Sequence, residues 1–175
     1  MTSSKKGYTL IELIVSVGIF ALIMVLASGA YIVMIGVNRQ AQGIATGIDN
    51  LSFALESMTR SIRTGTAYNC DGLGDCPDGA NNLSLTDDQG AAVTYSLNGS
   101  SIQKNENGVV STLTDPSVVV SSLMFYAVGT APESNGGNTE QARVTITVTG
   151  TVSSGPGKTE PFTIETGATM RGSDL

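Results

Sequence analysis

The fold is decided by the stretch Lys5-Lys6-Gly7-Tyr8-Thr9-Leu10-Ile11-Glu12-Leu13-Ile14-Val15, where a long apolar run begins. From there to Arg39 the sequence is almost wholly apolar or small, and Glu12 is the only charged residue between Lys6 and Arg39. About 20 such residues suffice to cross a hydrocarbon core of about 30 Å as a helix. An ionised carboxylate at that depth is costly unless it is neutralised or paired. Glu12 therefore calls for a nearby cation.

A short basic segment precedes the apolar run. Cleavage after Gly7 would create an α-amino group on Tyr8, four residues before Glu12, and such a group is cationic below its pKa of about 8. Lys5 and Lys6 favour a cytoplasmic location for this segment by the positive-inside rule. A secretory signal would be cut after the apolar run instead. The helix is thus expected to remain in the mature chain, with the rest facing a compartment that permits disulfides.

These residues resemble the prepilin signature of type IV pilins and type II secretion pseudopilins. The signature is a basic leader ending in glycine, an aromatic first mature residue, and a glutamate at the fifth mature position. Here the matching positions are residues 1–7, Tyr8 and Glu12, with Tyr8 in place of the more usual phenylalanine. The resemblance implies that a membrane prepilin peptidase cleaves between Gly7 and Tyr8 and methylates the Tyr8 amine. It also implies that Glu12 pairs with the Tyr8 amine of a neighbouring subunit during assembly.

Four segments are expected along the chain: a leader that is removed (1–7), a transmembrane or filament-core half of a long helix (8–38), its amphipathic half (39–64) and a globular head (65–175). Gly65 is expected to end the helix, because glycine is common just past helix carboxyl ends. The amphipathic half carries apolar residues at spacings of three and four, which predicts one face packed on the head. These residues are Ile44, Ile48, Leu51, Leu55, Met58 and Ile62.

Four glycines share a broad face of the expected helix, namely Gly29, Gly36, Gly43 and Gly47. Small residues at such spacings let helices approach closely in a membrane. They would suit a crowded filament core. The alternative is that the glycines are simply tolerated within a transmembrane helix.

The head is expected to be rich in strands, because short runs of Val, Thr, Ser and Ile alternate there with turn signals. The predicted strands are Ala92–Leu97, Ser101–Lys104, Val109–Leu113, Val118–Val128, Ala142–Thr149 and Phe162–Thr166, with Asn98-Gly99 as a hairpin turn. Loops are predicted for Thr66–Gly90, with a strand starting near Leu83–Leu85, and for Ser153–Pro161 and Pro132–Gly137, where Asn135–Asn138 would be the least ordered stretch. An antiparallel sheet packed on the outer half of a long helix is an α+β fold. The resemblance implies the same arrangement, the pilin "lollipop".

The composition argues against several kinds of site. The chain has no histidine, and 9 basic residues stand against 15 acidic ones, for a net charge of −6. Histidine is the commonest metal ligand and a frequent general base, and an acidic chain argues against a broad nucleic-acid interface. Neither a Gly-x-Ser-x-Gly motif nor a phosphate-binding loop occurs, and the paired carboxylates Asp87-Asp88 fall in a polar turn. The chain is therefore predicted to be no enzyme and to need no cofactor.

The outer loop carries two cysteines and several carboxylates. Cys70 and Cys76 are predicted to form a disulfide that closes a short surface loop, the alternatives being free thiols or an intermolecular bridge. Asp71, Asp75 and Asp78 offer oxygens of the kind that calcium prefers. The loop lacks EF-hand spacing, and acidic loops are usually just solvated. No metal site is predicted, and these three aspartates remain weak candidates.

These observations predict a structural, pilin-like subunit of a type IV pilus or related filament. Its partners would be other pilin or pseudopilin subunits, prepilin peptidase, and an inner-membrane assembly platform with a separate ATPase. The helix end Leu51–Arg63 and the last strand region Phe162–Gly172 are loosely similar to those of minor pilins and minor pseudopilins. The alternatives are a pseudopilin of a type II secretion or competence system, or an unprocessed adhesion or binding module tethered to the membrane. The precursor would cross the cytoplasmic membrane once, leader inside, before joining an extracellular or periplasmic filament.

Overall fold

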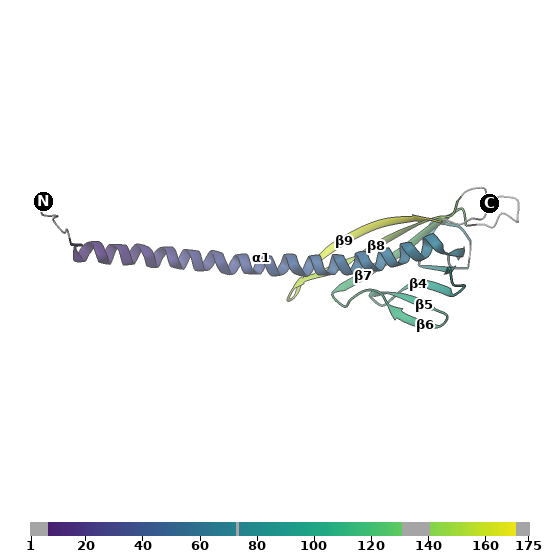
Figure 1. Ribbon diagram of the computed structural model, residues 1–175, viewed down its shortest axis with the longest axis horizontal. Helices are drawn as coiled ribbons and strands as arrows, with labels where there is room; N and C mark the ends of the chain where they lie inside the picture. Colours follow the sequence, from purple (N-terminus) through teal and green to yellow (C-terminus); the bar gives the residue numbers. More distant parts are fainter. Residues whose placement is uncertain (1–6, 73, 131–140, 171–175) are drawn as a thin grey trace, which may run out of the picture. The chain divides into compact units, whose positions relative to one another are not determined.

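The computed structural model describes residues 7–72, 74–130 and 141–170, which form one helix and nine strands (Figure 1). The chain divides into two compact units, Met1–Ala41 and Gln42–Leu175. Helix α1 (Leu10–Thr64) contributes its first part to the first unit and its last part to the second. The loop predicted for Pro132–Gly137, including the stretch Asn135–Asn138, lies outside the described residues.

The long helix agrees with the prediction, and it begins at Leu10 rather than at Tyr8. No proline occurs before Pro77, so nothing in the sequence breaks the ladder of backbone hydrogen bonds. The helix ends where glycine was expected to end it. A Cβ atom on Gly65 would lie 2.8 Å from Leu85 Cδ1 and 2.9 Å from the Ser61 carbonyl oxygen. Gly65 therefore also allows the strand that contains Leu85 to approach the end of the helix closely.

Tyr68 caps the carboxyl end of α1. Its buried hydroxyl donates to the Gly65 carbonyl at 2.6 Å and also lies within hydrogen-bonding reach of the Ile62 carbonyl. The last carbonyls of a helix have no partner within the helix, so this side chain satisfies groups that burial would otherwise leave unpaired. Burial raises the pKa of Tyr68 to about 12.

Replacing Tyr68 with phenylalanine is expected to lower the free energy of unfolding by about 1–3 kcal/mol, because buried carbonyls lose their donor. An unfolded tyrosine ionises near pH 10, whereas folded Tyr68 ionises at about 12. The stabilisation linked to this raised pKa is fully present below pH 10 and is lost as the pH rises towards 12. Urea denaturation of the detergent-solubilised chain at pH 8 and at pH 11 measures both effects.

In the Tyr68→Phe variant the loss of stability at high pH should shrink to the part due to Tyr95, whose pKa burial also raises, and to Lys104, whose pKa the hydrogen bond with Glu106 raises. Equal stability of variant and wild type at pH 8 would contradict the capping role.

Nine strands follow the helix in the described part of the chain: β1 (Thr66–Asn69), β2 (Cys76–Ala80), β3 (Asn82–Thr86), β4 (Ala92–Asn98), β5 (Ser101–Glu106), β6 (Val109–Thr112), β7 (Val118–Val128), β8 (Arg143–Gly155) and β9 (Lys158–Thr169). They form two antiparallel sheets instead of the single sheet predicted. One has the order β1-β3-β4-β5-β6, and the other has the order β2-β7-β8-β9. The α+β class is confirmed.

The prediction of a loop over Thr66–Gly90 is wrong except for the strand expected near Leu83–Leu85, which is β3. β1 has four residues and β2 carries Pro77 and Gly79, so neither shows the alternation that marks a strand. β2 forms because it pairs with the distant strand β7, as Cys76 opposite Ala127 and Ala80 opposite Phe125. Local sequence contains no signal for such a pairing.

The prediction of a loop over Ser153–Pro161 is also wrong. β8 and β9 extend through most of this segment as a hairpin, with Gly155 and Gly157 at positive φ in the turn. Burial still alternates along β8 as far as Val152 and Ser154, which point into the core. The many small and polar residues hide this alternation in the sequence. The Asn98-Gly99 turn between β4 and β5 is confirmed, with Asn98 opposite Ser101.

The core of the second unit lies between the outer part of α1 and both sheets (Figure 1). Its helix residues include Leu51, Leu55, Met58 and Ile62, all at most 5% exposed. These four residues of the predicted apolar face are thus confirmed, and Ile44 packs partly buried against the core, whereas Ile48 is only partly buried and does not belong to the core cluster. Burying one such side chain contributes about 1.5–3 kcal/mol.

The helix glycines divide into two pairs with different surroundings. A Cβ atom on Gly47 would lie 1.8 Å from Val152 Cγ2, and one on Gly43 would lie 3.0 Å from the Ser153 carbonyl oxygen. Both therefore allow β8 to approach the helix, a contact within the head that the shared-face interpretation did not anticipate. A Cβ atom on Gly29 or Gly36 would meet no described atom within 4 Å, so close helix packing there remains a prediction.

The disulfide predicted between Cys70 and Cys76 is present. Cys70 directly follows β1 of the five-stranded sheet, and Cys76 begins β2 of the four-stranded sheet. The bond therefore links the two sheets as well as closing a short loop. The chain-entropy relation assigns about 2–3 kcal/mol to a loop of this length.

Candidate functional site

The predicted cleavage site lies immediately before α1. Gly7 and Tyr8 are exposed, Tyr8 at 88%, and no described atom lies within 4 Å of a Cβ position on Gly7. The peptide bond between them is therefore accessible in this structure. Lys5 and Lys6 lie outside the described residues.

Glu12 lies in the first turn of the helix and contacts Thr9. The backbone amide and the hydroxyl of Thr9 each donate to Glu12 Oε2 at 3.4 Å, and the Glu12 amide donates to Thr9 Oγ1 at 3.4 Å. This is a capping box, in which a threonine and a glutamate three residues later satisfy each other's backbone amides. The Thr-x-x-Glu spacing could have revealed it, but the prediction for Glu12 rested on its charge and on its place in the prepilin signature.

The capping box leaves most of the Glu12 carboxylate open to another partner. A carboxylate has about four acceptor positions, and the contacts with Thr9 lie at the long end of the hydrogen-bond range. A neighbouring amine could therefore bind Glu12 without disrupting the helix start.

The residues that follow Glu12 expose an apolar surface. Val25, Leu26 and Ile32 are all at least 70% exposed in the isolated chain. α1 is also the helix in the described part of the chain that is long and apolar enough, by length and composition, to cross a membrane. Helix and glutamate together match the pattern expected of a buried segment whose single charge needs a partner.

The three weak calcium candidates do not converge. The Asp71 carboxylate binds the side-chain amide of Asn82 and accepts from the Asn81 amide at 3.3 Å, which fixes the loop onto β3. Asp78 is exposed in β2. Within the described ranges, no group of three or more His, Cys, Asp or Glu residues is placed to hold a metal ion.

Asp75 instead ties the disulfide loop to the end of β7. Its carboxylate accepts from the Thr130 amide at 2.7 Å, from the Thr130 hydroxyl at 2.5 Å and from the Gly129 amide at 3.3 Å. The Thr130 hydroxyl holds the pKa of Asp75 below its usual value against the opposing effect of burial, and the two amides lower it further.

Replacing Asp75 with asparagine is expected to destabilise the head at neutral pH and to matter less in acid. A lowered folded pKa stabilises the protein above the unfolded value of about 4, and this contribution disappears as the pH falls through the folded pKa. Urea denaturation from pH 7 to pH 2 should show the two stabilities converging. The matched control is Asp88→Asn, because the Asp88 carboxylate makes no hydrogen bond to the described residues; a constant difference for Asp75→Asn across this range would contradict the assignment.

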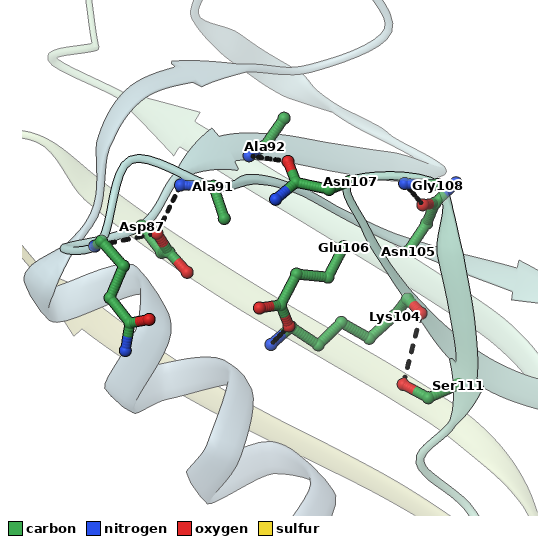
Figure 2. Close-up of polar contacts among 10 residues, drawn as sticks. Asp87, Ala91, Ala92, Lys104, Asn105, Glu106, Asn107, Gly108 and Ser111 are labelled. Carbon is green, nitrogen blue, oxygen red and sulfur yellow. Dashed lines mark hydrogen bonds and ion pairs between the residues drawn. The ribbon is translucent and has the colours of Figure 1, made fainter.

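The paired carboxylates Asp87-Asp88 belong to a structural turn. Figure 2 shows Asp87 accepting from backbone amides across the β3–β4 turn, among them that of Ala91 at 2.7 Å. In the neighbouring β5–β6 turn, the Asn105 side chain accepts from the Gly108 amide at 2.9 Å. Nearby, Lys104 and Glu106 form the ion pair drawn in the same view. These groups order the five-stranded sheet and supply no nucleophile paired with a base.

The comparisons with known proteins concern the amino-terminal segment. A family model described as "Prokaryotic N-terminal methylation motif" matches residues 2–28. The comparisons with curated proteins and with solved structures gave no match. The match covers Gly7, Tyr8 and Glu12, the residues whose accessibility and spacing are described above. The chain thus carries the N-terminal methylation motif that is the signal of type IV pilins and pseudopilins.

Proposed function

We propose that the protein is a structural subunit of a type IV pilus or related filament, cleaved by prepilin peptidase between Gly7 and Tyr8 and methylated on the Tyr8 amine. The observation that carries the proposal is the methylation motif at residues 2–28. It stands at the head of a helix whose apolar surface is exposed in the isolated chain. Assembly into a filament would pack this surface against the same helix of neighbouring subunits. The apolar side chains would then stay out of water after the subunit leaves the membrane.

Glu12 is assigned the role of pairing with the Tyr8 amine of a neighbouring subunit. Either charge alone would be costly in an apolar environment, and together they offset much of that cost. Since one pair forms at a defined place on each helix, the pairing also sets the register between subunits. Lys5 and Lys6 orient the precursor with its leader in the cytoplasm, and a separate ATPase on the assembly platform supplies the energy.

A finer part of the proposal concerns the kind of subunit. The loose similarity of Leu51–Arg63 and Phe162–Gly172 to minor subunits favours a minor component, which counting copies per filament would test. The alternatives are a pseudopilin of a secretion or competence system and a tethered adhesion or binding module. The location of the mature chain distinguishes these functions. A pilus subunit would be found in extracellular pili, a pseudopilin in short periplasmic filaments, and a tethered module in the membrane without assembly.

The decisive experiment determines the amino-terminal sequence and intact mass of the chain from membranes and from sheared surface filaments. The proposal expects a chain that begins at N-methylated Tyr8 and is present in the filament fraction. A chain confined to the membrane with residues 1–7 still attached would overturn it and support the tethered module.

A further inference from the structure

Two asparagine–glycine pairs lie in turns of the five-stranded sheet, within the described residues. Asn98-Gly99 lies between β4 and β5, and Asn107-Gly108 lies between β5 and β6. A third pair, Asn135-Gly136, lies outside the described residues. Both asparagines of the two turns are exposed. An asparagine before glycine is chemically labile, because glycine has no Cβ atom that would shield its amide nitrogen from the asparagine side chain.

Hydrogen bonds restrain both reacting groups of the pair Asn107-Gly108. Asn107 Oδ1 accepts from the Ala92 amide at 3.0 Å, and the Gly108 amide donates to Asn105 Oδ1 at 2.9 Å (Figure 2). The Asn107 side chain is therefore tied to β4, and the Gly108 amide proton is bound to an acceptor. Both contacts oppose an attack of the Gly108 nitrogen on the Asn107 side chain.

The pair Asn98-Gly99 lacks this protection. Gly99 is exposed, and its amide donates to no group of the described residues. The Asn98 side chain makes one hydrogen bond to the described residues, from Nδ2 to Gln103 Oε1 at 3.1 Å, and this bond joins two side chains at the surface. The nucleophile is thus open to solvent, and the side chain that it attacks is restrained by a single surface contact.

We propose that Asn98 is a modification site of the head, where the folded protein deamidates. The Gly99 amide nitrogen loses its proton to hydroxide and attacks Asn98 Cγ, and the bond from Cγ to Nδ2 breaks and releases ammonia. Water then adds to the cyclic succinimide. Opening at Cγ gives aspartate, whereas opening at the backbone carbonyl carbon gives isoaspartate, in which the backbone runs through Cγ. The net reaction consumes water and releases ammonia without oxidation or reduction.

The isoaspartate product changes a link between the two sheets. The carbonyl of Ser100, in the same turn, accepts from the Val120 amide of β7 at 2.9 Å. An extra methylene group in the backbone at Asn98 moves Ser100 relative to β7. The modification also adds a negative charge to a chain whose net charge is −6. We therefore expect the Val120 amide to lose protection from hydrogen exchange in the isoaspartate form.

Incubation of the detergent-solubilised full-length chain at mildly alkaline pH tests the proposal, and neither processing nor assembly enters the outcome. Peptide mapping by mass spectrometry measures each asparagine separately and distinguishes aspartate from isoaspartate. Asn98 should deamidate about tenfold faster than Asn107, because the hydrogen bonds of the second pair must break before it reacts. Equal rates, a faster reaction at Asn107 or an unchanged Asn98 would overturn the proposal.

Asn105→Ala tests the cause of this difference. It removes the acceptor of the Gly108 amide, so deamidation of Asn107 should become about fivefold faster while the rate at Asn98 stays the same. Ser111→Ala is the matched control, because Ser111 lies on β6 of the same hairpin and does not contact the Gly108 amide. It should change neither rate. An unchanged rate at Asn107 in the Asn105→Ala variant would overturn the protection assigned to these hydrogen bonds.

Hydrogen exchange measures the effect on the two sheets. Ion exchange separates the more acidic, deamidated chains after incubation, and mass spectrometry then compares exchange in the β7 peptide that contains Val120. The isoaspartate chains should exchange faster there, and the Asn98→Gln variant should keep its protection after the same incubation, because the longer side chain forms the cyclic intermediate much more slowly. Full protection at Val120 in isoaspartate chains would overturn the effect on the link between the sheets.

Discussion

Replacing Gly47 with valine is expected to lower the free energy of unfolding of the head by about 3 kcal/mol. Overfilling a packed core costs about 1–3 kcal/mol and sometimes more. We expect a cost at the upper end of this range for Gly47, because even a Cβ atom would lie 1.8 Å from Val152 Cγ2 and 3.2 Å from Val152 Cβ. Val152 is 2% exposed and is paired within the sheet, so it cannot move aside without disturbing β8. The gain in helix propensity over glycine, below about 1 kcal/mol, does not compensate.

Urea denaturation of the detergent-solubilised full-length chain measures this loss. Thr46→Val is the matched control, since Thr46 is the exposed neighbour of Gly47 and surface substitutions usually change stability by less than about 0.5 kcal/mol. The double variant Gly47→Ala with Val152→Ala should be more stable than the sum of the single effects predicts, because the second change makes room for the first. Additive losses would show that the two residues do not compete for space.

The glycines illustrate why the sequence predicts a helix better than it predicts the surroundings of that helix. Gly36 and Gly43 have the same spacing pattern and similar neighbours in the sequence. A Cβ atom on the first would meet no described atom within 4 Å, whereas one on the second would meet Ser153 of the distant strand β8. The contact exists because β8 extends beyond the predicted strand end and passes over the helix. No local pattern contains that information.

The strands show the same division. β4 and β8 were predictable, because apolar residues alternate with polar ones and one face is buried. β5 was predictable from the Asn98-Gly99 turn that joins it to β4, and β7 from its long run of strand-forming residues. β1 and β2 were not, because they are short and owe their conformation to partners in two different sheets. The disulfide between Cys70 and Cys76 was predictable as a loop closure, but its role as a link between sheets follows from this topology alone.

The candidate site, in contrast to these strands, could be predicted from the sequence. The order Gly7, Tyr8 and Glu12 is local, so it was recognisable in the sequence, and the capping contact of Glu12 with Thr9 could have been recognised as well. The groove beside the last turns of α1 could not, because one of its walls comes from Ile164 on the distant strand β9. Function encoded in a short linear motif is accessible from sequence, whereas a surface built from remote elements requires the fold.

Replacing Glu12 with alanine is expected to leave cleavage after Gly7 intact and to reduce recovery in sheared filaments by more than about a hundredfold. Removing one partner of a buried charge pair costs about 3–5 kcal/mol, because the other charge remains unpaired, and about 1.4 kcal/mol corresponds to a factor of ten. Quantifying processed chain in membrane and filament fractions measures the effect. The variant Gly7→Val should retain residues 1–7, which separates a processing defect from an assembly defect.

Thr9→Val is the control that the structure provides for Glu12. It removes the hydroxyl from the capping box and costs about 0.5–2 kcal/mol of helix stability, but it leaves the Glu12 carboxylate available to a neighbour. Near-normal filament recovery for Thr9→Val, with loss for Glu12→Ala, would assign the defect to the missing charge. Equal losses in both variants would mean that Glu12 acts by starting the helix. Normal recovery of Glu12→Ala would contradict the pairing, because a neighbour's amine would then be tolerated in the filament core without a carboxylate.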